Sequence, residues 1–328
     1  MKNILLWMVF VLSASVAFSE ERSLPLADPF VLEHNGMYYA YGTHYRTGIV
    51  VYRSNDLMHW EGPCGLAPYG LALHKNDSWG EKNFWAPEIY KTDSGFVMTY
   101  SVEEHTAIAY ADDPRGPFRQ IEPYSVYFPY FKNIDSHIFV DDDGQAYLYW
   151  VAWFNDRGNE IFVSRLSPDL THTIGAPVEC LHSQLGTWEV KRFPDGHVSR
   201  VVEGPYVLKH KGVYYLTYSA NDYRSQDYAV GYATSDSPFG PWKRYEGNPI
   251  LRRPGNLVGT GHHAFFSTSE GDDYIVFHAH RSKKSVSPRS MYIAPYMFKE
   301  RKNRPDRLVI DTKNIMIPVE TGRRRTLQ

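Results

Sequence analysis

Three acidic residues, Asp28, Asp135 and Glu203, lie far apart in the chain, each within a run of strand-forming apolar residues. An unpaired charge in such surroundings costs free energy, and its pKa is expected to shift. Two carboxylates that meet in a sugar-sized pocket can cleave a glycosidic bond. One protonates the leaving oxygen, and the other activates water or attacks the anomeric carbon. The alternative is that all three are ordinary turn or capping acids, which accounts poorly for their apolar context.

Turn glycines relate these acids to two further residues. Asp135, Glu203 and His262 each precede a turn glycine by nine residues, whereas Asp28 precedes one by eight and Glu88 by seven. If equivalent strands lead into these turns, the five side chains occupy equivalent positions around one axis. We therefore predict a ring of four carboxylates and one histidine. In this ring Glu88 would orient a substrate or support the structure.

The turn glycines belong to a repeat in which a turn and an aromatic strand are followed by a second strand and a polar turn. Its period is about 50 to 70 residues, which is typical of propellers and arrays. Short alternating strands between Asp, Gly and Pro turns predict antiparallel hairpins. The five copies are centred on Gly36, Gly95, Gly144, Gly212 and Gly271.

Five such units predict an all-β chain folded as a five-bladed β-propeller. Short strands cannot bury both faces alone, but radial stacking buries them and leaves only short, protected edges. An open solenoid of five β units is the structural alternative. No Gly/Ser-rich or Pro-rich linker divides the chain, so residues 20–328 are predicted to form one catalytic domain. The basic, polar tail from Lys299 onward is expected to pack only at its start.

The composition narrows the range of partners. The 25 Tyr, 17 Phe and 8 Trp residues suit strands and a β core, and exposed aromatic rings stack on sugars. A formal net charge of −2 gives no general attraction to polyanions, which argues against a nucleic-acid partner. Cys64 and Cys180 are too few for a disulfide framework, although one bridge between them remains open. We expect a monomer.

The first 19 residues have the pattern of a signal peptide. Lys2 provides the positive start, residues 4–11 the short apolar stretch, and Ala17-Phe18-Ser19 the small-residue cleavage pattern. The apolar stretch is too short to span a bilayer, and no later stretch is long enough. The mature protein is therefore expected to begin near Glu20, to be periplasmic or extracellular, and to lack a membrane span.

At these residues the chain resembles glycoside hydrolase family 43, the five-bladed propellers that include arabinofuranosidases, β-xylosidases and arabinanases. The matching segments follow the family's order along nearly the whole mature chain. Ser136 departs from the family pattern, in which proline frequently follows the helper aspartate. The segments are Ala27-Asp28-Pro29, Trp85-Ala86-Pro87-Glu88, Ile134-Asp135-Ser136-His137-Ile138-Phe139, Val202-Glu203-Gly204-Pro205, Gly259-Thr260-Gly261-His262-His263 and Arg289-Ser290-Met291-Tyr292-Ile293.

The resemblance implies an inverting hydrolase with Asp28 as general base and Glu203 as general acid. Asp135 would modulate the pKa of the acid and orient it. His262 matches a histidine that, in many members, faces a calcium ion or a water cluster on the axis. A hydrogen-bonded histidine without metal is the alternative, and the chemistry itself requires no cofactor. Arg289 resembles the arginine that reaches the sugar from the last blade.

The sugar is the least determined feature. Trp85, Phe84, Trp188 and Tyr223 are candidates for the pocket wall, and Trp85 is favoured because it lies close to Glu88. The block from Ser219 to Tyr223 resembles relatives that act on arabinofuranosyl side chains. We therefore expect an exo-acting α-L-arabinofuranosidase for plant polysaccharides or oligosaccharides. A β-xylosidase or galactofuranosidase is the close alternative, and a noncatalytic carbohydrate-binding propeller is the alternative of another class.

Overall fold

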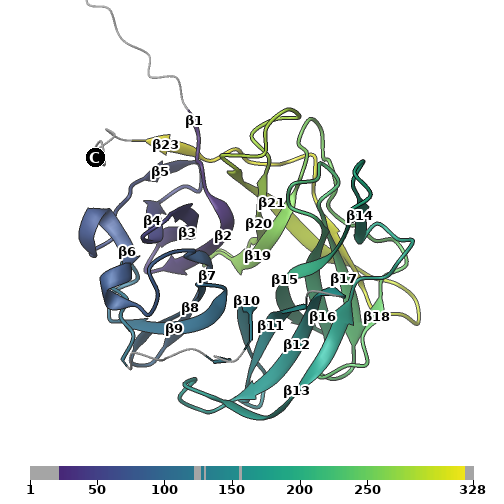
Figure 1. The fold of residues 1–328 in the computed structure, drawn as a ribbon, viewed down its shortest axis with the longest axis horizontal. Helices are drawn as coiled ribbons and strands as arrows, with labels where there is room; N and C mark the ends of the chain where they lie inside the picture. The colour runs from purple at the N-terminus through teal and green to yellow at the C-terminus, as the bar shows by residue number, and fades with distance from the viewer. Residues whose placement is uncertain (1–21, 122–126, 129–130, 155–156, 322–328) are drawn as a thin grey trace, which may run out of the picture.

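The computed structural model describes residues 22–121, 127–128, 131–154 and 157–321. Five sheets of mainly antiparallel strands stand around a central axis as the blades of a propeller, which confirms the predicted fold (Figure 1). Blade 2 has three strands within the described residues. The predicted signal peptide lies outside the described residues. No helix among the described residues is both long and apolar enough to cross a membrane.

Each blade runs from the axis outward along the chain. The innermost strands are β2 (Ala27–His34), β7 (Trp85–Thr92), β10 (Asn133–Val140), β15 (Val198–His210) and β19 (Gly261–Ser267). The second strands are β3 (Met37–Tyr45), β8 (Gly95–Val102), β11 (Ala146–Phe154), β16 (Val213–Asn221) and β20 (Asp273–Ala279). The third strands are β4 (Gly48–Ser54), β9 (His105–Ala111), β12 (Gly158–Leu166), β17 (Ala229–Ser235) and β21 (Ser290–Lys299).

The remaining elements lie at the rim or extend a blade. The outer strands are β5 (His59–Glu61), β13 (Thr173–His182), β18 (Lys243–Arg244) and β22 (Arg307–Ile310). Additional strands are β1 (Arg22–Ser23), β6 (Leu71–His74), β14 (Val190–Arg192) and β23 (Val319–Thr321), and single 3₁₀ turns occupy Pro68–Gly70 and Lys75–Asp77. β14 pairs with the start of β15. At 13 residues, β15 is the longest of the five innermost strands.

The predicted glycine turns join the first and second strand of every blade. Gly36 and Gly212 adopt φ values of 73° and 78° in two-residue turns, a conformation that favours glycine. The core lies between neighbouring blades, where apolar side chains of adjacent sheets pack together. Much of the aromatic excess is used there, since Trp60, Trp150 and eight tyrosines are fully buried.

The chain end closes the ring. β23 pairs in parallel with β5 of blade 1 and antiparallel with β1. The Leu24 carbonyl also accepts a hydrogen bond from the Met291 N–H of blade 5, at 3.0 Å. The expectation that only the start of the tail packs was wrong. Backbone pairing of β23 needs no apolar sequence, and β22 buries Leu308 and Ile310.

The two cysteines do not form a bridge. Cys64 packs against the core cluster of blade 1, and Cys180 packs against the cluster between blades 3 and 4. Both thiols are free, because the fold holds them on different blades. Burial raises the pKa of the Cys64 thiol to about 11, so this thiol stays protonated and unreactive.

Candidate active site

An irregularity in each innermost strand directs side chains toward the axis. In all five strands the pairing with the second strand is interrupted for two residues. In all five strands the first of these two residues has a positive φ. In β15 this residue is Gly204, directly after Glu203. We call these five residues the bulge residues. They are Asp28 (48°), Ala86 (44°), Asp135 (53°), Gly204 (54°) and His262 (45°).

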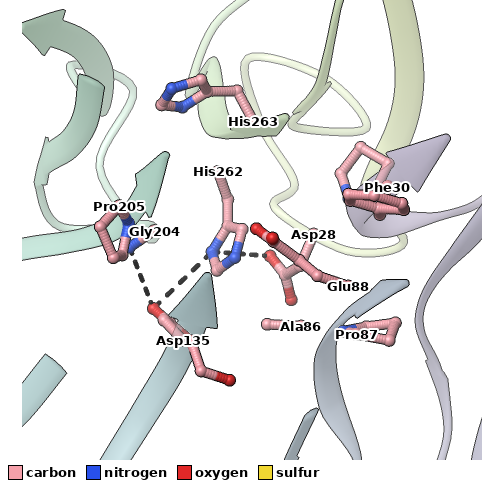
Figure 2. A pocket seen from close by; sticks show the side chains of 12 residues that line it. Asp28, Phe30, Ala86, Pro87, Glu88, Asp135, Gly204, Pro205, His262 and His263 are labelled. Carbon is pink, nitrogen blue, oxygen red and sulfur yellow. Dashed lines mark hydrogen bonds and ion pairs between the residues drawn. The ribbon is translucent and has the colours of Figure 1, made fainter. Parts of the chain in front are cut away.

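The bulges place two aspartates and a histidine at one end of the propeller axis. A left-handed backbone is strained for residues other than glycine, and bulges beside active sites re-aim side chains. Figure 2 shows Asp28, Asp135 and His262 pointing toward one another, with Ala86 and Gly204 completing the circle. The sequence prediction that Asp28, Asp135 and His262 meet at the axis is therefore met by the geometry.

Glu88 lines the axial space but does not occupy the bulge position that the turn count predicted for it. Ala86 is the bulge residue of blade 2, and Glu88 lies two residues further along β7. Its Oε2 is 2.7 Å from Nδ1 of His137. Glu88 lines two smaller cavities, of about 10 and 200 Å³, and not the large one described below. Glu88 therefore has a structural role in the axial channel, where it binds His137.

Asp28 is held in its ionised form. Burial raises the pKa of its carboxyl, but Arg289, His262 and His278 outweigh burial and leave the pKa well below its usual value. Arg289 donates to both carboxylate oxygens, at 2.7 and 3.3 Å. The His278 ring accepts from the Asp28 backbone N–H at 3.2 Å, and burial, followed by Arg289, lowers the pKa of that ring to about 3. A carboxylate that stays ionised is suited to act as a base.

Glu203 has the opposite character. Burial, helped by the nearby Asp28 and Asp222, raises the pKa of its carboxyl to about 7, against a hydrogen bond from Tyr228 that lowers it. The Tyr228 hydroxyl donates to Oε1 at 2.8 Å, and the Asn159 amide lies 3.5 Å from Oε2. Glu203 can therefore keep its proton near neutrality. Two carboxyl groups with separated pKa values are the pattern of an acid and a base.

Asp135 is a third carboxyl group of the large cavity described below. Burial raises the pKa of its carboxyl well above the usual value, and the charges of Glu203 and Asp28 add to this. Its Oδ2 accepts the Gly204 backbone N–H at 3.2 Å, the interaction drawn in Figure 2. Three carboxyl groups in one buried site do not ionise independently, so Asp135 influences how readily Glu203 holds its proton.

His262 approaches both aspartates. Its Nδ1 is 3.4 Å from Asp28 Oδ1 and 4.0 Å from Asp135 Oδ2. Burial lowers the pKa of the ring, against Asp28, which raises it, so the ring is neutral and these contacts are not ion pairs. The neighbouring His263 points into the protein, where its Nε2 is 2.7 Å from Thr217 Oγ1.

The side chains around His262 do not form a site of direct ligands for a calcium ion. Calcium takes six to eight oxygen ligands, and no group of three or more His, Cys, Asp or Glu side chains among the described residues is arranged to hold a metal. The space enclosed by the bulge residues is about 10 Å³, the size of one water molecule. Calcium beside His262 stays a prediction, and no step below depends on it.

A cavity of about 690 Å³ opens over the bulge residues. It is lined by Asp28, Asp135 and Glu203 together, and by three of the predicted substrate-binding residues, Trp85, Tyr223 and Arg289. The Arg289 guanidinium lies 5.1 Å from the centre of the Tyr223 ring. One chamber of sugar size therefore contains the ionised and the protonated carboxyl group.

Two predicted wall residues do not line this cavity. Phe84 is fully buried in the core of blades 1 and 2 and stacks on Tyr100. Trp188 packs on Tyr218 beneath the β14–β15 hairpin. Aromatic residues next to a predicted site are equally suited to the core, and Phe84, directly before β7, is buried while Trp85, its first residue, lines the cavity.

Several residues of the site were missed by the sequence analysis. Tyr228 and Asn159 contact Glu203, and Trp153 and Phe154 line the cavity from the end of β11. The repeat was read only along the innermost strands, whereas these residues come from other strands and their ends. Counting the same repeat along β12 and β17 would have singled out Asn159 and Tyr228 as flanking residues.

The comparisons with known proteins agree with this geometry. Residues 23–301 match the model of glycosyl hydrolases family 43. A solved structure named as an endo-1,4-β-xylanase from Bacteroides thetaiotaomicron VPI-5482 is 38% identical, with a TM-score of 0.82, and covers 92% of this chain and 99% of that chain. The β-D-galactofuranosidase xynD of Aspergillus niger is 28% identical over 77% of this chain and 73% of its own length.

A third relative differs in length. The extracellular endo-α-(1→5)-L-arabinanase of Thermotoga petrophila is 27% identical over 68% of this chain, which spans about half (51%) of that relative. The family match covers most of the chain, and the structural likeness extends over nearly all of it. The chain belongs to glycosyl hydrolases family 43 and has the fold of a glycoside hydrolase.

Proposed function

We propose that the protein is an inverting, exo-acting glycoside hydrolase that releases terminal α-L-arabinofuranosyl residues from plant polysaccharides or oligosaccharides. The observation that carries the proposal is one cavity shared by a carboxylate of lowered pKa, Asp28, and a carboxyl of raised pKa, Glu203. An inverting reaction needs such a pair, with a water molecule between the base and the anomeric carbon.

In this mechanism Asp28 accepts a proton from the attacking water. Arg289 holds the Asp28 carboxylate in one orientation with two hydrogen bonds, so the oxygen that receives the proton is fixed before substrate arrives. Glu203 donates its proton to the departing glycosidic oxygen. Asp135 shares this buried site with Glu203, so the two carboxyl groups do not ionise independently.

The wall of the cavity supports an exo-acting furanosidase. Residues 197–201 of the β14–β15 hairpin line one side of the cavity, which favours a chain end over a continuous polymer. Asp222 and Tyr223, from the segment that resembles arabinofuranosidases, line the same cavity. Trp85 and Tyr223 supply aromatic surface for a sugar ring. The similar proteins are named for activity on xylan, galactofuranosides and arabinan, so the choice of arabinofuranose rests on the residues of this wall.

A panel of aryl glycosides tests the choice of sugar. We expect kcat/KM for the aryl α-L-arabinofuranoside to exceed that for the β-D-xyloside and the β-D-galactofuranoside by at least about tenfold, because each misplaced hydroxyl leaves a buried polar group unpaired. Hydrolysis of the xyloside or the galactofuranoside alone would reject the arabinofuranosidase proposal and favour that relative's activity. Binding without turnover of any glycoside would indicate the noncatalytic alternative.

The pH profile should reflect the two carboxyl groups. Glu203 must be protonated, so kcat/KM is expected to fall as the pH rises through about 7, the pKa of that group. Asp28 must be ionised, and its lowered pKa keeps activity high into the acidic range. The variant Tyr228→Phe removes a hydrogen bond that favours ionised Glu203, so its alkaline limb should move to higher pH. An alkaline limb that stays in place in this variant would contradict the assignment.

We also infer that the protein is exported. The inference rests on the leader pattern around Lys2 and Ala17-Phe18-Ser19, and on a relative that is named extracellular. Polysaccharides too large to enter a cell would be met there. Mass spectrometry of the mature protein, with an N-terminus near Glu20, would test this inference.

A further inference from the structure

The backbone N–H of each bulge residue needs an acceptor, because the bulge leaves it unpaired within its own blade. In four blades that acceptor is a side chain on the second strand of the preceding blade. The distances from donor to acceptor are 3.0 Å from Ala86 to Thr43, 3.1 Å from Asp135 to Ser101, 2.8 Å from His262 to Ser219, and 3.2 Å from Asp28 to His278.

These four acceptors occupy one register position. Each acceptor is paired with the residue directly before the bulge residue of its own innermost strand. The pairs are Thr43 with Ala27, Ser101 with Trp85, Ser219 with Glu203, and His278 with Gly261. The position is therefore a repeated device that fixes the backbone of the next blade at the axis.

Blade 3 is the exception. The same register position, paired with Ile134, is occupied by Val151, which is fully buried and has no acceptor to offer. The bulge residue of the next blade is Gly204, and its N–H turns instead to the Asp135 carboxylate, at 3.2 Å. Figure 2 shows this bond beside His262.

We propose that Val151 is a positioning residue, which leaves the Gly204 N–H free to hold the Asp135 carboxylate in place beside Glu203. A hydroxyl at this position would lie where the hydroxyls of Thr43, Ser101 and Ser219 lie in their blades. It would compete for the one proton of the Gly204 N–H. The importance of Asp135 for turnover rests on the proposed function, whereas the competition for the N–H does not.

Loss of this bond changes the surroundings of Asp135 in a defined direction. The charged and titratable groups that face Asp135 are Glu203 on β15, Asp28 on β2, Arg289 before β21, His262 on β19 and Tyr228 before β17. The Gly204 N–H lowers the pKa of Asp135, so its removal raises that pKa further. The carboxylate would also lose the contact that fixes its orientation.

The substitution Val151→Thr tests the proposal, because threonine has nearly the shape of valine and adds the competing hydroxyl. With ¹⁵N-glycine labelling, the Gly204 amide signal of the unaltered protein should shift with pH as Asp135 titrates, and this dependence should be lost in the variant. We expect kcat to fall about tenfold with little change in KM.

A second pair guards against a variant that fails to fold. Val151→Ser and Val151→Ala leave cavities of similar size, and only serine offers an acceptor, so V151S should have about tenfold lower kcat than V151A. The proposal would be overturned if the Gly204 signal of V151T titrated as in the unaltered protein and the kcat of V151S equalled that of V151A. A lost Gly204 titration in a protein that hydrolyses no glycoside would support the exchange of hydrogen bonds and reject the proposed function.

Discussion

The variant Glu203→Gln should lose about 10²- to 10⁴-fold in kcat/KM on substrates with a poor leaving group, such as arabino-oligosaccharides. The amide keeps the shape of the side chain and its contact with Tyr228 but has no acidic proton for the departing oxygen. Aryl glycosides with an acidic phenol need little protonation, so their hydrolysis should fall much less. Measurement of kcat/KM against the pKa of the leaving group checks this expectation.

The binding of ligand separates a lost acid from a damaged site. Isothermal titration of E203Q with an oligosaccharide should give a dissociation constant close to that of the unaltered protein. Activity of E203Q equal to the unaltered protein on all substrates would refute Glu203 as the general acid. A matched control is Glu88→Gln, which makes the same change outside the large cavity. Its kcat/KM should stay within about threefold, or about 0.7 kcal/mol.

Replacing Asp28 by asparagine should lower kcat/KM about 10²- to 10⁴-fold whatever the leaving group, because every turnover needs the water to be deprotonated. This uniform loss distinguishes the base from the acid, whose loss depends on the leaving group. The measurement is the same series of aryl glycosides. Recovery of D28N activity with the best leaving groups would contradict the assignment of the base.

The substitution at Asp28 also has a structural effect that must be measured separately. A neutral amide in place of the carboxylate would leave the largely buried Arg289 guanidinium without its anionic partner, which destabilises the site. Thermal unfolding of D28N followed by circular dichroism shows whether the strands remain. An inactive variant that keeps its strands and binds ligand would attribute the loss to chemistry.

The fold was accessible from the sequence because its signals are local. Turn glycines, aromatic strands and Asp/Pro turns recur in each copy, and each copy makes one hairpin that needs no distant information. Convergence of Asp28, Asp135 and Glu203 followed from the same repeat, since equivalent strands of a propeller face one axis. The ring closure by β23 could not be predicted in this way. It depends on backbone pairing between segments that have no marked pattern.

The exact register of the site was harder to predict, for a physical reason. Gly36 is the second residue of a two-residue turn, whereas Gly144 is the fourth residue of a five-residue turn, so one count from glycine does not suit both blades. A count of nine from Gly95 gives Ala86, the observed bulge residue. Glu88 was predicted instead because it is an acid, although the count of nine indicated Ala86. Acids near a site are not all part of it.

Partners across blades were also beyond the sequence. Val151 affects Asp135 through the Gly204 N–H of the next blade, from a strand that the sequence pattern marks only as apolar and β-forming. Its role follows from which side chain of one blade meets which backbone group of the next. That relation depends on the stacking of blades, which no local pattern encodes.

The closure of the ring bears directly on the general base. Asp28 belongs to blade 1, while Arg289 and His278, which keep it ionised, belong to blade 5, and Ser290 next to Arg289 contacts Ser23 of the terminal strand β1 at 3.0 Å. The junction of blades 1 and 5, which the two chain ends close, therefore contains the ion pair between Asp28 and Arg289. Fraying at either end would separate Asp28 from its cation while most strands persist, so heat should inactivate the enzyme before it melts the propeller.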